Sequence, residues 1–224
     1  MKPIIKGQDN SNFCLIQPVD DHDELLLDDE YKLIANLTDN TPFLLAAFHV
    51  NDWNKDLSPW KAPAVFGKND FGDGAADTLT YITDRLIPDV NNLHLSGVEG
   101  EVHYIIGGYS LSALFALWAA HQIALFSACA AASPSVWFSG WMEYAGKNRI
   151  KVQNVYLSLG DKEEKAKNRI LASVGDCIRK QDELLESAVV NHILEWNQGN
   201  HFKDADVRTA KGFAWCVNQL RLRV

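Results

Sequence analysis

A serine in a glycine-rich turn is the residue of this sequence best placed to act as a nucleophile. The segment GGYSLS (107–112) follows the apolar run VHYII and precedes an apolar run of helical length. A serine on such a strand-to-helix turn is exposed if small residues two positions before and after it let strand and helix approach closely. Gly108 meets this requirement, whereas Ser112 stands where glycine or alanine is more usual. We predict Ser110 as a nucleophile; the alternative is an incidental serine in a glycine-rich turn.

A serine nucleophile needs a general base, and the base needs an orienting carboxylate. The strand–turn–helix setting of Ser110 resembles the α/β-hydrolase arrangement, which implies that the acid and then the histidine follow on loops after later strands. His201 lies in the turn NQGNH after the strand-like run VVNHILEW, which is the expected place in the chain. We predict His201 as the base, although an incidental turn histidine is an alternative in a chain with seven histidines.

The carboxylate that orients this base is expected in the segment GDKEE (160–164), which follows the strand-like run VQNVYLSL. Asp161 can cap a following helix, and Glu164, three residues later, would complete a capping box. Glu163 is then left without a structural duty. We therefore predict Glu163 as the acid, with Asp161 as the close alternative.

Two backbone N–H groups are needed to stabilise the oxyanion of the transition state. We expect one from Leu111, the residue after the nucleophile. The other is placed at the end of the run FLLAAFHV, near Val50 or Asn51, although the sequence has no HGGG-type motif there. The sequence shows no metal-ligand spacing, so we predict neither a metal nor a cofactor.

Tryptophans lie in the segments that follow predicted strands, where the edge of an active site is expected. Trp53 and Trp60 belong to a long segment (51–74) rich in Trp, Pro and Gly, and Trp137 follows the run of small residues at 126–132. Long loops of this kind are usually functional. The three side chains are predicted to line an apolar substrate pocket; ordinary core packing is the alternative.

The order of the remaining elements indicates an α/β protein. Apolar or alternating runs predict strands, and apolar residues at three- and four-residue spacing predict helices. Strands that alternate with helices favour a mostly parallel sheet with helices on both faces. We expect one domain over residues 1–224, without a large cap domain. The predicted strands are 13–18, 43–50, 101–106, 126–132, 152–159 and 189–196. One predicted helix starts at Ala75 and ends at Pro88, and four more span 111–122, 141–147, 162–187 and 204–222. Residues 20–36 are expected to be helical or irregular.

Composition limits the partners. The chain has 224 residues and is 47% hydrophobic, which fits a globular protein with a hydrophobic core. Its net charge of −8 repels the phosphate backbone of nucleic acids, so a nucleic-acid partner is not expected. Four cysteines are far apart and form no CxxC pair, which favours reduced thiols and a cytoplasmic protein. The longest apolar stretch is interrupted by glycines and serines, so no membrane span is predicted.

The motifs together resemble the α/β-hydrolase esterases that include esterase D-type and enterochelin esterase-like enzymes. The resemblance lies in GGYSLSALFALWA, ASPSVWF, NDWNKDLSPW, YLSLGDKEE and GNHF, which are spread over most of the chain. It implies the α/β-hydrolase fold and a serine hydrolase built on Ser110, an acid within 160–164, and His201. A small-molecule ester is the expected substrate. An acyltransferase or thioesterase that uses the same serine, and a non-catalytic binding module, are the alternatives.

Overall fold

A seven-stranded sheet forms the centre of the protein in the computed structural model, which describes residues 3–65 and 67–222. The strand order is β1-β3-β2-β4-β5-β6-β7, and every neighbouring pair is parallel except β1 and β3. The mostly parallel sheet predicted from the sequence is confirmed. The strands are β1 Ile4–Gly7, β2 Phe13–Val19, β3 Leu44–His49, β4 His103–Tyr109, β5 Ala128–Ala132, β6 Asn154–Gly160 and β7 Asn191–Asn197.

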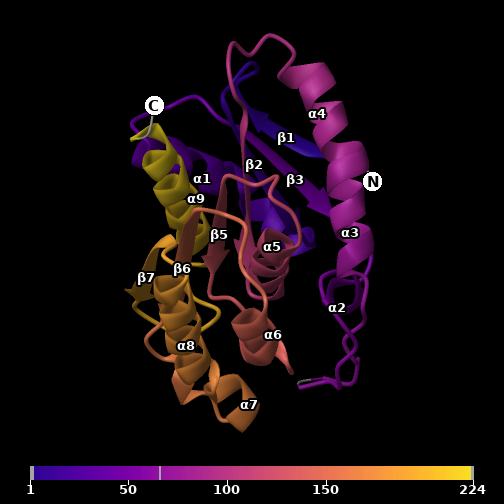
Figure 1. Ribbon diagram of the computed structural model, residues 1–224, viewed down its shortest axis with the longest axis vertical. Helices are drawn as coiled ribbons and strands as arrows, with labels where there is room; N and C mark the ends of the chain where they lie inside the picture. Colours follow the sequence, from indigo (N-terminus) through magenta and orange to yellow (C-terminus); the bar gives the residue numbers. More distant parts are fainter. Residues whose placement is uncertain (1–2, 66, 223–224) are drawn as a thin grey trace.

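Helices cover both faces of the sheet (Figure 1). One layer holds α1 and α9, which pack against each other, and the other holds α5 with α6 and α8. The described residues contain no inserted cap domain between the strands. The helices are α1 Asp21–Leu37, α2 Trp53–Asp56, α3 Ala75–Tyr81, α4 Ile87–His94, α5 Leu111–Gln122, α6 Trp141–Lys147, α7 Arg169–Ala172, α8 Val174–Ser187 and α9 Ala205–Arg221.

The two faces of the sheet form two separate hydrophobic cores because side chains alternate along a strand. In β2, Cys14 and Ile16 belong to the core under α5, whereas Phe13 and Leu15 belong to the core under α1 and α9. Helix α5 is buried from Leu111 to His121. A helix that is apolar on all sides is typical of such a buried position.

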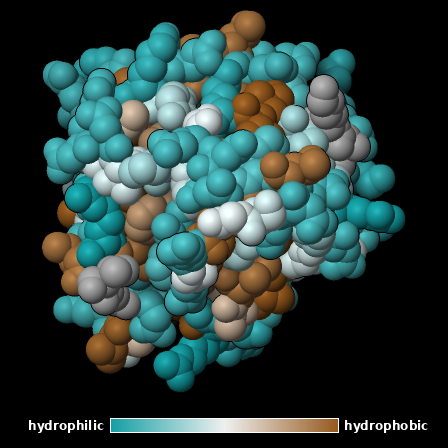
Figure 2. All heavy atoms as spheres, turned by 90° about the horizontal axis from the view of Figure 1, so that it is seen from above, coloured by the Kyte–Doolittle hydropathy of each residue, from teal (hydrophilic) through white to brown (hydrophobic). Residues whose placement is uncertain are grey.

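Polar residues dominate the surface that is seen from above the view of Figure 1 (Figure 2). Hydrophobic residues appear there in several separate groups between hydrophilic ones. Scattered exposed hydrophobic residues are common on proteins and do not by themselves mark a binding site.

The prediction of one helix over 162–187 was wrong. The segment folds as a 3₁₀ turn at Glu163–Lys165, then α7, then α8. The predicted capping box was also wrong, because Lys162 precedes the 3₁₀ turn and makes no side-chain capping bond. The 3₁₀ turn keeps Glu163 beside the end of β6, where its Oε1 accepts from the N–H of Gly160.

The helix that begins at Ala75 does not end at Pro88, as predicted, but continues to His94. A π-helical segment, Ile82–Leu86, joins α3 to α4, and the N–H of Ile87 donates to the carbonyl of Ile82. Proline in a helix interior removes one i→i−4 hydrogen bond. Here Pro88 directly follows the π-helical segment, so the break in the regular i→i−4 pattern falls beside the residue that cannot donate such a bond.

Candidate active site

Ser110 lies on a sharp turn between β4 and α5. Its backbone has φ 59° and ψ −118°, a conformation that costs a non-glycine residue about 1–3 kcal/mol. Two backbone hydrogen bonds hold the turn: the N–H of Ser110 donates to Ala132 O (3.1 Å), and the N–H of Ser135 donates to Ser110 O (3.0 Å). The neighbouring strand β5 and the segment after it therefore fix the position of the serine.

The residues on either side of the serine are small for a steric reason. A Cβ atom added to Gly108 would lie 1.8 Å from Ser112 Oγ, so only glycine fits at position 108. Ser112, which departs from the usual glycine or alanine, is buried, and its hydroxyl donates to Pro18 O at 3.2 Å. The departure is accommodated because the hydroxyl has an acceptor on β2.

The structure brings the three predicted side chains together. His201 Nε2 lies 2.9 Å from Ser110 Oγ, and His201 Nδ1 lies 2.7 Å from Glu163 Oε2. Glu163 is 6% exposed, whereas His201 is half-buried. The hydroxyl of Tyr109 donates to the backbone carbonyl of His201 at 2.8 Å, which holds the turn that carries the imidazole.

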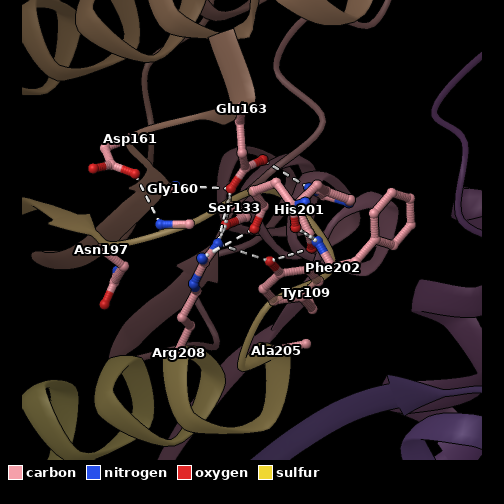
Figure 3. Close-up of polar contacts among 12 residues, drawn as sticks. Tyr109, Ser133, Gly160, Asp161, Glu163, Asn197, His201, Phe202, Ala205 and Arg208 are labelled. Atoms are coloured by element: carbon pink, nitrogen blue, oxygen red, sulfur yellow. Dashed lines mark hydrogen bonds and ion pairs between the residues drawn. The ribbon is translucent and has the colours of Figure 1, made fainter. Parts of the chain in front are cut away.

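Glu163 is surrounded by hydrogen-bond donors (Figure 3). Its Oε1 accepts from the N–H of Gly160 (2.7 Å), the hydroxyl of Ser133 (2.8 Å) and Nη1 of Arg208 (2.9 Å). Burial alone would raise the pKa of Glu163, but the bond to His201 and those from Gly160 and Ser133 outweigh it and lower the pKa. Glu163 is therefore held as a carboxylate.

Sequence analysis did not identify Ser133 or Arg208 as parts of this site. Both side chains are buried, and Arg208 reaches the site from α9, distant in sequence from Glu163. One feature of the sequence points to Arg208: it is the fourth residue of a helix whose other face is apolar. A buried arginine needs an anionic partner, but the sequence does not say which one.

The other two carboxylates of the segment have different partners. Asp161 is exposed, and its Oδ1 accepts from the N–H of Gly199 at 2.8 Å, which links the loops after β6 and β7. Glu164 pairs with Arg179 of α8 at 2.9 Å. Of the three candidates, Glu163 is the one whose carboxylate meets His201.

The predicted oxyanion donors differ in their surroundings. Leu111 is the first residue of α5, and N–H groups in the first turn of a helix have no acceptor within the helix. The N–H of Asn51, by contrast, donates to Asp56 Oδ2 at 3.0 Å, as does the N–H of Asp52. In this conformation the Asn51 group is already engaged, so its predicted role would require this bond to break.

The predicted pocket tryptophans are all half-buried. Trp53 begins α2, and Trp60 donates its indole N–H to Ser139 O at 2.8 Å. The Trp60 ring also packs against Phe138 and Tyr144, with ring centroids 5.9 and 5.3 Å away. Trp60 therefore has structural partners whatever it contacts in a substrate.

Trp137 lies closest along the chain to the nucleophile. It is two residues after Ser135, whose Oγ is 3.4 Å from Ser110 Oγ. The Trp137 ring packs against Phe71 of the segment 51–74, with ring centroids 6.1 Å apart. The segments that follow β3 and β5 are therefore in contact, and the second of them also contacts Ser110.

Two negative findings apply to the described part of the chain. No group of three or more His, Cys, Asp or Glu side chains within it is arranged to hold a metal ion. None of its helices combines the length and apolar character needed to cross a membrane.

Comparison with known proteins shows likeness in structure rather than in sequence. No protein-family model matches the chain, and a search of curated proteins finds no match. An IroE-like serine hydrolase from Shewanella oneidensis is similar in structure, with a TM-score of 0.75 at 14% identity over 96% of this chain and 79% of that one. Siderophore hydrolase EstA from Aspergillus nidulans has a TM-score of 0.73 at 19% identity, over 95% and 84%. A Bacillus cereus carboxylesterase has a TM-score of 0.61 at 15% identity, over 97% and 94%. The chain therefore has the α/β-hydrolase fold that its motifs predicted.

Proposed function

We propose that this protein is a serine esterase that hydrolyses a small-molecule carboxylic ester. The observation that carries the proposal is the continuous chain of contacts from Ser110 Oγ through His201 to Glu163, at 2.9 and 2.7 Å. The names of the structurally similar proteins, which include siderophore hydrolases and a carboxylesterase, support ester hydrolysis on this fold.

The geometry supports a two-step reaction. Ser110 Oγ attacks the ester carbonyl carbon while His201 Nε2 takes its proton, and the Leu111 N–H stabilises the oxyanion. The bond from carbon to the alcohol oxygen then breaks, and His201 returns the proton to the leaving alcohol. Water then attacks the acyl carbon while His201 takes its proton, the bond from this carbon to Ser110 Oγ breaks, and His201 returns the proton to Ser110 Oγ as the carboxylic acid leaves. Glu163 orients His201 and stabilises the imidazolium that forms.

The nucleophile can be tested with Ser110→Ala and a serine-directed phosphonate. We expect kcat to fall by about 10⁴–10⁶-fold, because members of a triad act as a unit. Ser135→Ala is the matched control, since it removes the hydroxyl 3.4 Å away. The phosphonate should label the wild type and the control but not Ser110→Ala. A Ser110→Ala enzyme that keeps a tenth of wild-type turnover would overturn the proposal.

We also propose that Trp53, Trp60 and Trp137 form the wall that faces the acyl group. Truncation to alanine should then lower kcat/KM for bulky acyl esters by about tenfold more than for acetyl esters, because small acyl groups do not reach the wall. Thermal melts separate this from a packing defect. A lower Tm with an unchanged preference for acyl length would show that the tryptophan is structural.

Transfer to another acceptor is the alternative use of the same serine. An acyltransferase or thioesterase would share the acyl-serine, so an added alcohol, amine or thiol is made to compete with water for it. If the acyl group is transferred to the added acceptor even when the acceptor concentration is low, the result supports an acyltransferase. A folded protein that no phosphonate labels would favour the binding module.

We expect the esterase to act in the cytoplasm without nucleic-acid or membrane partners. The net charge of −8 and four free cysteines, three of them buried, are consistent with this.

A further inference from the structure

We propose that Arg208 is a positioning residue. It fixes the acid and the base of the site relative to each other by joining the carboxyl ends of four neighbouring strands, β4 to β7. The inference rests on the proposed esterase function. Arg208 belongs to α9 and acts on the reacting groups through the residues that it contacts. Figure 3 shows its side chain extending from the helix into the cluster formed by Glu163, Ser133, Tyr109 and the His201 turn.

One nitrogen of the guanidinium contacts the ends of three strands. Arg208 Nη1 lies 2.9 Å from Glu163 Oε1 after β6, 3.2 Å from Ser133 Oγ after β5, and 3.1 Å from the hydroxyl of Tyr109, the last residue of β4. Ser133 and Tyr109 donate their own protons elsewhere, to Glu163 Oε1 and to His201 O. Their oxygen lone pairs are therefore free to accept from Arg208.

The other nitrogen contacts the turn that carries the base. Arg208 Nη2 lies 3.1 Å from Asn200 O and 3.4 Å from Gln198 O, both after β7. The carbonyl of His201 itself accepts from Tyr109, whose hydroxyl contacts Nη1 of the same arginine. The backbone on which the imidazole depends is thus fixed relative to the carboxylate by one planar group.

This arrangement decides which carboxylate oxygen serves the histidine. The guanidinium occupies Oε1 of Glu163 and leaves Oε2 for His201 Nδ1. Arg208 is 1% exposed, and a buried ion pair of this kind is often no more stable than a hydrophobic pair of similar volume. Its presence is therefore better explained by positioning than by stability.

Lysine cannot replace the guanidinium in this role. An ammonium group is a single point with three donors, whereas arginine presents five donors in a rigid fork. The titratable and charged groups shown to face Glu163 are His201 from the turn after β7, Arg208 from α9 and Tyr109 from β4. Removal of the positive charge from this group would favour protonation of both Glu163 and the imidazole, so the active form would require a higher pH.

The test compares Arg208→Met and Arg208→Lys with the wild type. We expect Arg208→Met to lower kcat by about 100-fold with KM changed by less than about threefold, since misplacement of the base by about 1 Å has an effect of this size. The acidic midpoint of the kcat/KM–pH profile should move to higher pH. Arg208→Lys, which keeps the charge but loses the fork, should lower kcat by about tenfold with a smaller shift of the midpoint.

Arg179→Met is the matched control, because it breaks an arginine–glutamate pair in the same region, with Glu164, without touching Glu163. It should leave the midpoint unchanged. In a Glu163→Gln background, Arg208→Met should lower kcat little further. If Arg208→Met does not fold, Arg208→Lys decides: a wild-type kcat overturns the proposal. A folded Arg208→Met enzyme with an unshifted midpoint, and a kcat reduced only with the folded fraction, also overturns it.

A measurement without turnover separates this proposal from the esterase proposal. The downfield NMR resonance of the proton between His201 Nδ1 and Glu163 should be present in the wild type and shifted or lost in Arg208→Met. An unchanged resonance overturns the positioning role. Failure of the wild type to hydrolyse esters or to react with the phosphonate overturns the esterase function, whatever the resonance does.

Discussion

Two buried glutamates in different regions of the molecule behave in opposite ways. Glu163, at the edge of the sheet, is 6% exposed, and its pKa is lowered. Glu30, on α1, is 5% exposed, and its pKa is raised to about 8. Burial raises the pKa of both carboxyl groups, so burial alone does not account for the opposite directions of the two shifts.

The partners of each carboxylate explain the contrast. Glu163 accepts hydrogen bonds from four groups, and those from His201, Gly160 and Ser133 lower its pKa. For Glu30, burial is the main cause of the raised pKa; Gln17 lowers it by a hydrogen bond, and Asp23 and Asp206 raise it further. Among the described residues, Oε1 of Glu30 has no hydrogen-bond partner.

The contrast shows that hydrogen-bond partners, and not burial, decide whether a buried carboxyl group in this protein is ionised. The two groups also affect stability with opposite dependence on pH. The lowered pKa of Glu163 stabilises the fold at pH values above the unfolded-state pKa, and this stabilisation is lost as the pH falls through the pKa of the folded state. The raised pKa of Glu30 destabilises the fold increasingly as the pH rises from the unfolded value toward about 8.

For the two glutamates, the largest expected effect is on activity, from Glu163→Gln. We expect kcat to fall by about 10³–10⁴-fold, because an amide cannot stabilise the imidazolium or fix the histidine tautomer. Loss of the carboxylate also leaves Arg208 buried without a counter-charge, which costs about 3–5 kcal/mol of stability. Steady-state kinetics per folded molecule, with urea unfolding to count the folded fraction, measures both effects.

Two variants with the same chemical change serve as controls. Glu30→Gln and Glu164→Gln should each keep kcat within about twofold of the wild type, since neither carboxylate contacts His201. A loss from Glu164→Gln equal to that from Glu163→Gln would contradict the assignment of the acid.

The positions of Ser110 and His201 could be predicted because each depends on local features and chain order. Glu163 was selected by elimination from a capping box that the structure lacks, so its contact with His201 was predicted from a wrong premise. A strand, a small-residue turn and an apolar helix are visible around Ser110, and the chain order places the acid and base after later strands. The roles of Ser133 and Arg208 could not be predicted, since they arise from contacts between segments 30 and 45 residues from Glu163.

Several boundaries could not be predicted for a related reason. The amphipathic pattern over 162–187 fits one helix, but Glu163 must reach the sheet edge, and tertiary contacts override the local pattern. Strand β1 is short and pairs antiparallel at the edge of the sheet, so it has almost no periodic signal.

The second expected effect is on stability, from Glu30→Gln. Between the ordinary glutamate pKa of 4.5 and the folded value of about 8, the unfolded chain is ionised and the folded one is protonated. Folding must therefore take up a proton, which costs about 3 kcal/mol near pH 7. Glutamine removes this cost. The variant should be more stable than the wild type at pH 7–9 and equally stable near pH 4, in urea unfolding at each pH. A stability difference that does not change with pH would show that Glu30 is not protonated in the fold.

The smallest expected effect comes from Asp161, the alternative acid. Its carboxylate accepts from the N–H of Gly199 and does not meet His201, so it supports the turn through one hydrogen bond. Asp161→Asn keeps an acceptor oxygen and should lower kcat by less than about threefold. Asp161→Ala removes the bond, which is worth about 1 kcal/mol, and should have a larger but still modest effect, of about tenfold or less. Both follow from kcat measured beside Glu163→Gln under the same conditions. If Asp161→Asn were the more damaging of the two amide substitutions, Asp161 would be the acid, and the dense bonding of Glu163 would be structural, like the packing around Glu30.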